Sequence, residues 1–289
     1  MQHNKSKIGD AFIILIFIIL ILVCILPMMN VFSRALSSAP YLIRGEVGIF
    51  PRGITMQNFE LVWSDAKYPR SLAWTAILTL IAATLSLTLT IMCAFPFVYK
   101  QLKARKTINF LLIFTMYFGA GTIPTFLLYR TLGLIDNPLV MIIPNALSIF
   151  NFILMRSFFY GIPDSIRESA EIDGAGPFKV LTLIYLPLSK ASLATIFLFY
   201  AVGRWNGYGD ALVFMPRATE WYPIQLLLYN IQQGFQNVDV VTQEGFLPVG
   251  IGEGIKTATI VIATVPILMI YPFLQKYFVA GATMGAIKE

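Results

Sequence analysis

Residues 161–187 read GIPDSIRESAEIDGAGPFKVLTLIYLP and lie between two long apolar runs. The stretch carries six charged side chains. A charged side chain at the centre of a membrane-spanning helix costs about 3 kcal/mol, so we expect this stretch to lie outside any bilayer that the flanking runs enter. A short helix kept outside lipid in this way is typical of an element that is presented to a partner.

Local signals predict where this short helix begins and ends. Ser165 and Glu168 form an S-x-x-E capping box, which predicts a start near Asp164 or Ser165. Acidic residues in the first turn favour the positive end of the helix dipole. Gly174 and Gly176 are expected to end the helix, because glycine adopts the left-handed conformation found after many helices.

The composition indicates a membrane protein. Of 289 residues, 57% are hydrophobic and 12% are charged, and the mean hydropathy is +0.73. A soluble domain carries about 25% charged residues. The net charge of +6 would suggest a nucleic-acid partner in a soluble protein. In a membrane protein it indicates basic cytoplasmic loops instead, so no nucleic-acid partner is expected.

Six apolar runs fit membrane spans, each of which needs about 20 residues to cross the hydrocarbon. Gly119, Gly121 and Pro124 interrupt the outer half of the third run. Pro144 is expected to kink the fourth, because proline removes a helix hydrogen bond. The six runs are residues 11–31, 71–99, 107–129, 138–155, 191–203 with part of 184–189, and 257–271.

The distribution of basic residues predicts the orientation. Six spans place both termini on one side. The terminus, the 100–106 connection, the 156–190 loop and the tail hold twelve of the 21 basic residues and six of the 15 acidic residues. The whole net charge therefore lies on this side. Cytoplasmic loops carry the excess of Lys and Arg, so both termini and residues 161–187 are expected in the cytoplasm.

This topology divides the chain in two. Residues 1–70 form an N-terminal span and the first extracytoplasmic loop, and residues 71–289 form the core transmembrane region. The first apolar run is longer than the apolar part of a signal peptide and no A-x-A-like site follows it, so we expect it to be retained. A second polar region, residues 204–256, contains a helix-like apolar piece at residues 224–231.

The 161–187 stretch resembles the EAA loop of permease subunits of bacterial ATP-binding-cassette (ABC) importers. The family pattern is E-A-A, three residues, G, nine residues, then I-x-L-P. Here the spacing is the same, with Ser169 at a position that is usually alanine. From the residues alone, an ordinary capped loop remains an alternative. The resemblance implies contact with an ATPase subunit through Glu168, Ser169, Ala170, Asp173, Gly174, Ile184, Leu186 and Pro187.

Further segments are similar to sugar permeases. Trp205–Tyr208 resembles a W-N-x-aromatic motif, residues 275–278 a closing Q-[RK]-Y-F, and residues 285–288 a terminal G-A-[IV]-K. Residues 37–38 and 50–59 look like the first loop of an oligosaccharide subgroup. The resemblance implies an all-α type I importer permease with six spans and a cytoplasmic coupling helix between spans four and five. A permease for a non-sugar solute is the alternative.

The resemblance also implies the partners. These are a homologous second permease subunit, two ABC ATPase subunits, an extracytoplasmic solute-binding protein and a sugar, in a bacterial cell membrane. Residues 250–257 imitate a Walker A motif but place Ile255 where glycine is required. ATP and Mg²⁺ are therefore expected on the ATPase partner. No cofactor and no catalytic residue are expected on this chain.

Cysteine and histidine usage gives no support for a metal centre or an embedded enzyme. Cys24 and Cys93 lie within apolar runs, and apolar surroundings make a thiol unreactive. His3 is the one histidine in the sequence. A metal site built on cysteine and histidine is therefore not expected. A membrane-embedded enzyme would need clustered His, Asp or Glu at the membrane face, and the sequence has none.

Polar side chains within the spans are candidates for a substrate path. No charged residue lies deep in a predicted span, so coupling to an ion is not indicated. Asn145 and Ser148 are expected in line with Met141 and Phe152 at helical spacing. Arg204, Trp205 and Tyr208 lie where a gate or a binding-protein contact is expected. Hydrogen bonding between helices is the alternative role for each path candidate. The candidates are Tyr117, Asn145, Ser148, Tyr200 and Trp205.

Overall fold

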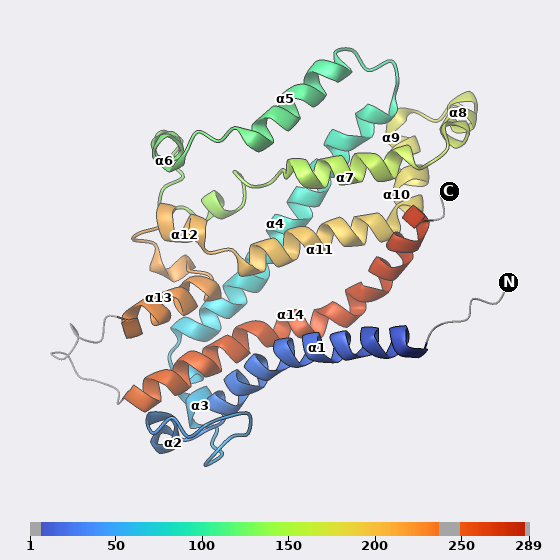
Figure 1. The fold of residues 1–289 in the computed structure, drawn as a ribbon. Coiled ribbons are helices and arrows are strands. Elements are labelled where there is room, and N and C mark those ends of the chain that lie inside the picture. Colours follow the sequence, from blue (N-terminus) through green and yellow to red (C-terminus); the bar gives the residue numbers. More distant parts are fainter. Residues whose placement is uncertain (1–6, 237–248, 287–289) are drawn as a thin grey trace. The chain divides into compact units, whose positions relative to one another are not determined.

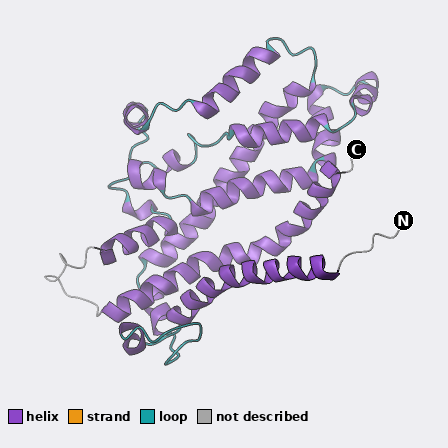
Figure 2. Cartoon of the chain, viewed as in Figure 1, coloured by secondary structure: helices purple, strands orange, loops and turns teal. Residues whose placement is uncertain are grey.

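The computed structural model describes residues 7–236 and 249–286, and every regular element in these ranges is a helix (Figure 1, Figure 2). The chain forms two compact units. One contains the chain up to Pro69 together with Leu227–Pro266, and the other contains Arg70–Leu226 and the chain from Ile267. His3, Ile287 and Lys288 lie outside the described residues, as do the side chains of 271–286.

The first unit packs the N-terminal helix against two later helices. Ala35, Val62, Ala258 and Val261 form its buried apolar cluster. The buried Asn58 side chain donates hydrogen bonds of 2.9 Å to the backbone carbonyls of Ala35, the last residue of the N-terminal helix, and of Ser37. Its helices are α1 (Lys7–Ala35), α2 (Ala39–Ile43), α3 (Gln57–Ser64) and the first part of α14 (Val249–Ala286).

The second unit contains the remaining elements. Helix α4 continues directly into η1, and α7 lies alongside α11 (Figure 1). Its elements are α4 (Lys67–Ala94), η1 (Phe95–Val98), α5 (Arg105–Tyr117), α6 (Thr122–Thr131), η2 (Pro138–Met141), α7 (Ile149–Tyr160), α8 (Asp164–Ile172), α9 (Pro177–Val180), η3 (Leu181–Tyr185), α10 (Leu186–Leu188), α11 (Lys190–Asn206), α12 (Gly209–Phe214), η4 (Thr219–Trp221) and α13 (Ile224–Gln236), the last of which continues into the first unit.

Two predicted spans are bent pairs of helices. Helices α5 and α6 meet at 112°, and the break falls at the predicted glycines, with Gly121 at φ +85°. The helical stretch Pro177–Leu188 meets α11 at 85°. Within the described residues, three helices are long and apolar enough to cross a membrane, or up to five if each bent pair is one span.

The sequence predicts one helical span over residues 138–155 with a kink at Pro144, but the structure has a longer break there, from residue 142 to residue 148. A single 3₁₀ turn, η2, is followed by irregular backbone, and α7 begins only at Ile149. Ser148 is the N-cap, and its hydroxyl accepts the Asn151 N–H at 3.4 Å. Pro144 has no N–H to continue a helix, and a serine side chain competes for the amides of a new first turn. The expected alignment of Met141, Asn145, Ser148 and Phe152 on one helix face is therefore not present.

Candidate functional site: a polar cavity and the loop at residues 161–187

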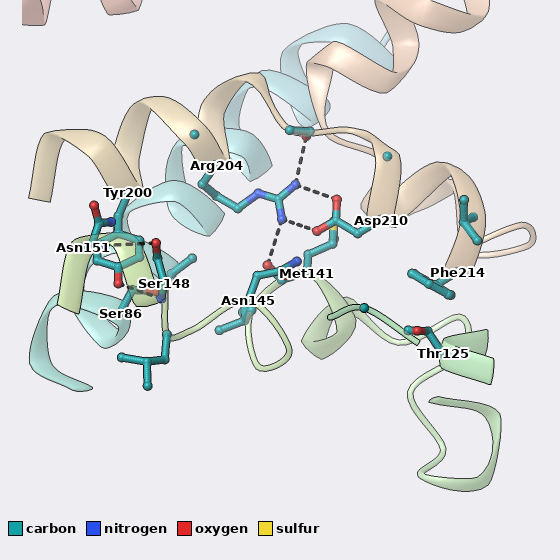
Figure 3. Close-up of a pocket in the computed structure, with 18 of the residues that line it drawn as sticks. Ser86, Thr125, Met141, Asn145, Ser148, Asn151, Tyr200, Arg204, Asp210 and Phe214 are labelled. Carbon is teal, nitrogen blue, oxygen red and sulfur yellow. Dashed lines mark hydrogen bonds and ion pairs between the residues drawn. The ribbon is translucent and has the colours of Figure 1, made fainter. Parts of the chain in front are cut away.

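The second unit contains a cavity of about 810 Å³. Its wall is formed by α4, the α5–α6 break, the connection between η2 and α7, α11 and α12 (Figure 3). Two breaks in helices face it, at Gly121 and at Asn145. Irregular backbone at membrane depth is tolerated where it lines a cavity or is buried in protein, and both breaks meet that condition.

One end of the cavity is organised by the Tyr200 hydroxyl. This hydroxyl accepts the Ser148 N–H at 3.0 Å and lies 2.7 Å from the Thr90 hydroxyl of α4. Ser86 and the Asn151 amide also line this end (Figure 3). The hydrogen bonds join α4, α7 and α11 at a point where backbone amides at the start of α7 would otherwise lack partners.

A buried ion pair organises the other end. The Arg204 side chain is 8% exposed and that of Asp210 is 14% exposed. The guanidinium donates to both Asp210 oxygens at 2.5 and 3.0 Å, and to the carbonyls of Met141 and Gly207 at 2.9 Å each (Figure 3). This bidentate pair ties the end of α11 to η2 and α12. Its two charges cancel within the wall.

The cavity wall combines hydrogen-bonding side chains, aromatic rings and one internally neutralised ion pair. Its wall offers the amide side chains of Asn145 and Asn151, hydroxyls, and the aromatic side chains of Phe199, Tyr200 and Phe214. Among the described lining residues, the charged side chains are those of Arg204 and Asp210, which neutralise each other. A polyhydroxylated solute could exchange hydrogen bonds between its hydroxyl groups and these amides, and could pack its C–H faces on the rings.

The structure brings together three of the five predicted path residues. Asn145, Ser148 and Tyr200 line the cavity. Tyr117 is 76% exposed at the end of α5, and Trp205 is buried; neither lies in the cavity wall. Sequence reasoning placed Arg204 at a mouth of the path but missed Asp210. Their spacing of six residues crosses a helix end, so no helical periodicity relates them.

Helix α8 begins where it was predicted to, but the predicted capping box is wrong. The helix starts at Asp164 after Pro163, and no side chain caps it. Ser165 is already inside the first turn, so its hydroxyl is not in the N-cap position. Glu168 instead accepts a hydrogen bond from Arg167 at 3.2 Å.

The end of α8 forms a complete Schellman motif. The Gly174 N–H donates to the Glu171 carbonyl at 3.0 Å, and the Ala175 N–H donates to the Ala170 carbonyl at 2.9 Å. Gly174 has φ +82°, which confirms it as the terminating glycine. Gly176 was also expected to end the helix, but it has φ −71° and precedes α9 as its N-cap.

The residues of the 161–187 loop fall into two groups. Ala170, Ile184 and Leu186 pack against the apolar core of the second unit, around the fully buried Tyr185. The other members of the predicted contact set are exposed: Glu168, Ser169, Asp173, Gly174 and Pro187. The loop is thus held to the core of the second unit by its apolar residues, and its polar residues in and just after α8 remain exposed.

One ion pair and one cation–π contact attach α8 to the two residues that follow η1. Lys100 lies 2.8 Å from Asp164, and the hydrogen bond from this ammonium holds the pKa of the Asp164 carboxyl below its usual value. Arg167 is the buried residue of the helix, and its guanidinium lies over the Tyr99 ring, 5.1 Å from the centroid. Sequence reasoning assigned no role to Arg167.

Comparisons with known proteins agree on one family. The family model described as "Binding-protein-dependent transport system inner membrane component" matches residues 79–284. The chain is 34% identical to the polygalacturonan/rhamnogalacturonan transport system permease protein YtcP of Bacillus subtilis (strain 168), over 98% of this chain and 99% of that protein. It is 36% identical to protein LplC of the same organism, over 92% and 90% of the two chains.

A solved structure has the same fold. A chain of a bacterial ABC transporter involved in the import of the acidic polysaccharide alginate superposes with a TM-score of 0.84 at 32% identity. The match covers 96% of this chain and 99% of that chain. A chain from the alginate transporter in complex with a pentasaccharide-bound periplasmic protein matches at a TM-score of 0.55 and 17% identity, which shows the fold alone.

Proposed function

The chain belongs to the family of inner membrane components of binding-protein-dependent transport systems, and on this premise we propose that it is the permease subunit of an ABC importer for an oligosaccharide. The observation that favours a carbohydrate is the chemical composition of the cavity wall. Its amides, hydroxyls and rings suit a polyhydroxylated solute, and its one ion pair is neutralised internally. Two permeases of Bacillus subtilis support the same class: YtcP is described as a polygalacturonan/rhamnogalacturonan transport system permease protein, and MelC as a melibiose/raffinose/stachyose import permease protein.

The proposed topology has six spans with both termini in the cytoplasm of a bacterial cell. Three long helices would supply three of these spans, and the two bent pairs would supply two more if each pair crosses the membrane once. Helix α7 is 12 residues long, and together with the preceding irregular segment it would supply the sixth. This arrangement puts the basic 100–106 connection and α8 on the cytoplasmic side, as the excess of Lys and Arg there favours.

The proposed partners follow from this arrangement. A homologous permease subunit would complete the path, an extracytoplasmic binding protein would deliver the sugar, and two ATPase subunits would bind ATP and Mg²⁺. Helix α8 would seat in the ATPase surface through its exposed residues, Glu168, Ser169, Asp173 and Gly174. Closure of the ATPase pair would then move α8 and rock the helices around the cavity.

The direct test is co-purification with the ATPase subunit, followed by sugar uptake in reconstituted vesicles. Glu168→Lys reverses the charge on the exposed face of α8, and Gly174→Asp places a side chain at φ +82°. We expect both variants to lose the ATPase subunit and uptake, while Lys103→Gln, a change in the neighbouring connection, keeps both. Unchanged assembly and uptake in the two α8 variants would refute the role of α8.

The alternative is a permease of the same fold for a non-sugar solute. A screen of solutes against the cognate binding protein separates the two, with saccharides of different charge and length compared with peptides and amino acids. Binding of a saccharide supports the proposal. Binding of a peptide or amino acid with no saccharide binding would replace it.

A further inference from the structure

Helix α8 has one buried charged side chain, that of Arg167, on the side opposite its exposed face. Arg167 is 8% exposed in a helix whose other described residues are half-buried or exposed. Arginine is seldom buried unless it is paired. Its pairing is with its own helix: Nη1 donates to the two Glu171 oxygens at 3.0 and 2.9 Å, and Nη2 donates to Glu168 at 3.2 Å.

These carboxylates hold the guanidinium against a residue from another element. The Arg167 guanidinium carbon lies 5.1 Å from the centre of the Tyr99 ring, within the range of a cation–π contact. Tyr99 directly follows η1, and the next residue, Lys100, pairs with Asp164 at 2.8 Å. Two adjacent residues at the end of the α4–η1 segment therefore contact α8.

From Tyr99 the packing continues to the cavity. The Tyr99 ring meets Phe95 edge-on at 5.6 Å, and Phe95 meets the fully buried Tyr185 at 5.3 Å. Phe95 begins η1, which continues α4 without a gap, and α4 supplies Ala82 and Ser86 to the cavity wall. A chain of packed side chains and one continuous helical segment thus joins α8 to the cavity.

We propose that Arg167 is a positioning residue that fixes α8 to the α4–η1 segment, so that displacement of α8 reaches the cavity wall through α4. The inference rests on the proposed docking of α8 to an ATPase. Displacement of α8 would then reach the rest of the second unit in two ways, through the chain that joins α8 to α7 and α9 and through the contact with the α4–η1 segment. Coupling between distant sites needs a contiguous network of packed elements, and the Arg167–Tyr99 contact supplies the link between these two.

The test uses the complete transporter in liposomes, with both permeases, the ATPase pair and the binding protein loaded with the sugar identified in the solute screen. Arg167→Gln and Tyr99→Leu are expected to leave assembly intact and to lower the sugar transported per ATP hydrolysed about threefold or more. Tyr99→Phe keeps the ring face and is expected to match the wild type. In the double variant that combines Arg167→Gln with Tyr99→Leu, the two losses in sugar transported per ATP should not multiply. Both changes remove the same Arg167–Tyr99 contact.

Lys103→Gln is the matched control, since it removes an exposed charge from the same connection. The proposal is overturned if Tyr99→Leu keeps the wild-type ratio of transport to hydrolysis, or if the two losses multiply in the double variant. If Arg167→Gln does not assemble, the comparison of Tyr99→Leu with Tyr99→Phe decides alone. A wild-type complex that fails to form or to transport sugar would count against the proposed function instead.

Discussion

At the scale of single residues, the Arg204–Asp210 pair carries a large electrostatic cost. Both side chains are nearly excluded from solvent, and removing a charge from water costs several kcal/mol. The pair is tolerated because the guanidinium donates hydrogen bonds to four acceptor oxygens. Its position in the wall makes it both a tie between three elements and a boundary of the cavity.

Asp210→Asn is expected to destabilise the protein by about 3 kcal/mol, because it leaves the Arg204 cation buried without a counter-charge. The double change Arg204→Met with Asp210→Leu should recover at least half of this loss, since no charge then remains buried. Glu46→Gln is the control, because its pair with Arg52 is 3.5 Å long and exposed. The midpoints of thermal unfolding in detergent compare the stabilities of the Asp210→Asn, double and Glu46→Gln variants. Equal midpoints for Asp210→Asn and Glu46→Gln would contradict the argument.

Gly174 and Gly176, the two glycines after α8, differ in backbone conformation: only Gly174 has a positive φ. Gly174→Ala is expected to cost about 1 kcal/mol, because φ +82° is strained for a residue with a side chain, although no atom lies within 4 Å of the added Cβ. Hydrogen exchange of the Ala175 amide should then be about fivefold faster. Gly176→Ala, at φ −71°, should leave this rate unchanged. A similar acceleration in both variants would show that backbone strain is not the cause.

At the scale of elements, α4 holds the irregular segment before α13 through buried hydroxyls. The Thr75 hydroxyl accepts the Ile224 N–H at 2.9 Å, and Thr75 is fully buried. The Ser71 hydroxyl, one turn earlier, donates to the Tyr222 carbonyl. Backbone groups released where a helix begins must find partners within the protein, and α4 supplies them.

Thr75→Val is expected to destabilise the protein by about 1–3 kcal/mol, because it leaves the buried Ile224 N–H without its acceptor. Thr79→Val, one turn along the same helix, is the matched control. The Thr79 hydroxyl oxygen is buried and has no hydrogen-bond partner among the described residues, so its loss should be neutral or stabilising. Chemical denaturation in detergent would compare them. If Thr79→Val cost as much as Thr75→Val, side-chain shape would be the cause.

The elements that the sequence predicted well are those in which apolar character and helical backbone coincide. Residues 11–31, 71–99 and 257–271 lie within α1, within α4 and the residues that follow it, and within α14. Residues 138–155 are equally apolar, yet only the part from Ile149 is α-helical. Hydropathy reports the surroundings of side chains, and it does not distinguish a helix from irregular backbone that lines a cavity.

The candidate site was predictable where local spacing determines a contact or where a polar side chain stands within an apolar run, as Asn145, Ser148 and Tyr200 do. The ends of α8 follow from neighbouring residues, and the glycine at 174 was found. The Arg167–Tyr99 contact joins residues that are 68 positions apart in the sequence, and the Arg204–Asp210 pair crosses a helix end. No periodicity encodes such pairs, because they depend on how elements pack.

At the scale of the whole molecule, large apolar surfaces are left uncovered. The apolar window of α1 has no buried residue, and neither α5 nor α6 has one. Exposed apolar areas of this extent are not stable against water, so lipid or another subunit must cover them. Cys24 and Cys93 lie in α1 and α4, and replacing both by alanine gives a background for introduced cysteines.

On that background, labelling with a membrane-impermeant maleimide tests the six-span topology. Cysteines at Arg44, Leu132 and Glu220 are expected to react in intact spheroplasts, because the topology places these exposed positions outside. Cysteines at Lys103 and Ser165 should react only after lysis, because the basic connection and α8 lie inside. Leu132 is the deciding position: it is outside only if the bent α5–α6 pair completes a crossing. If the cysteine at Leu132 is labelled only after lysis, the α5–α6 pair is a re-entrant segment and the six-span arrangement is refuted. If the cysteine at Ser165 reacts before lysis, α8 lies outside and cannot contact a cytoplasmic ATPase.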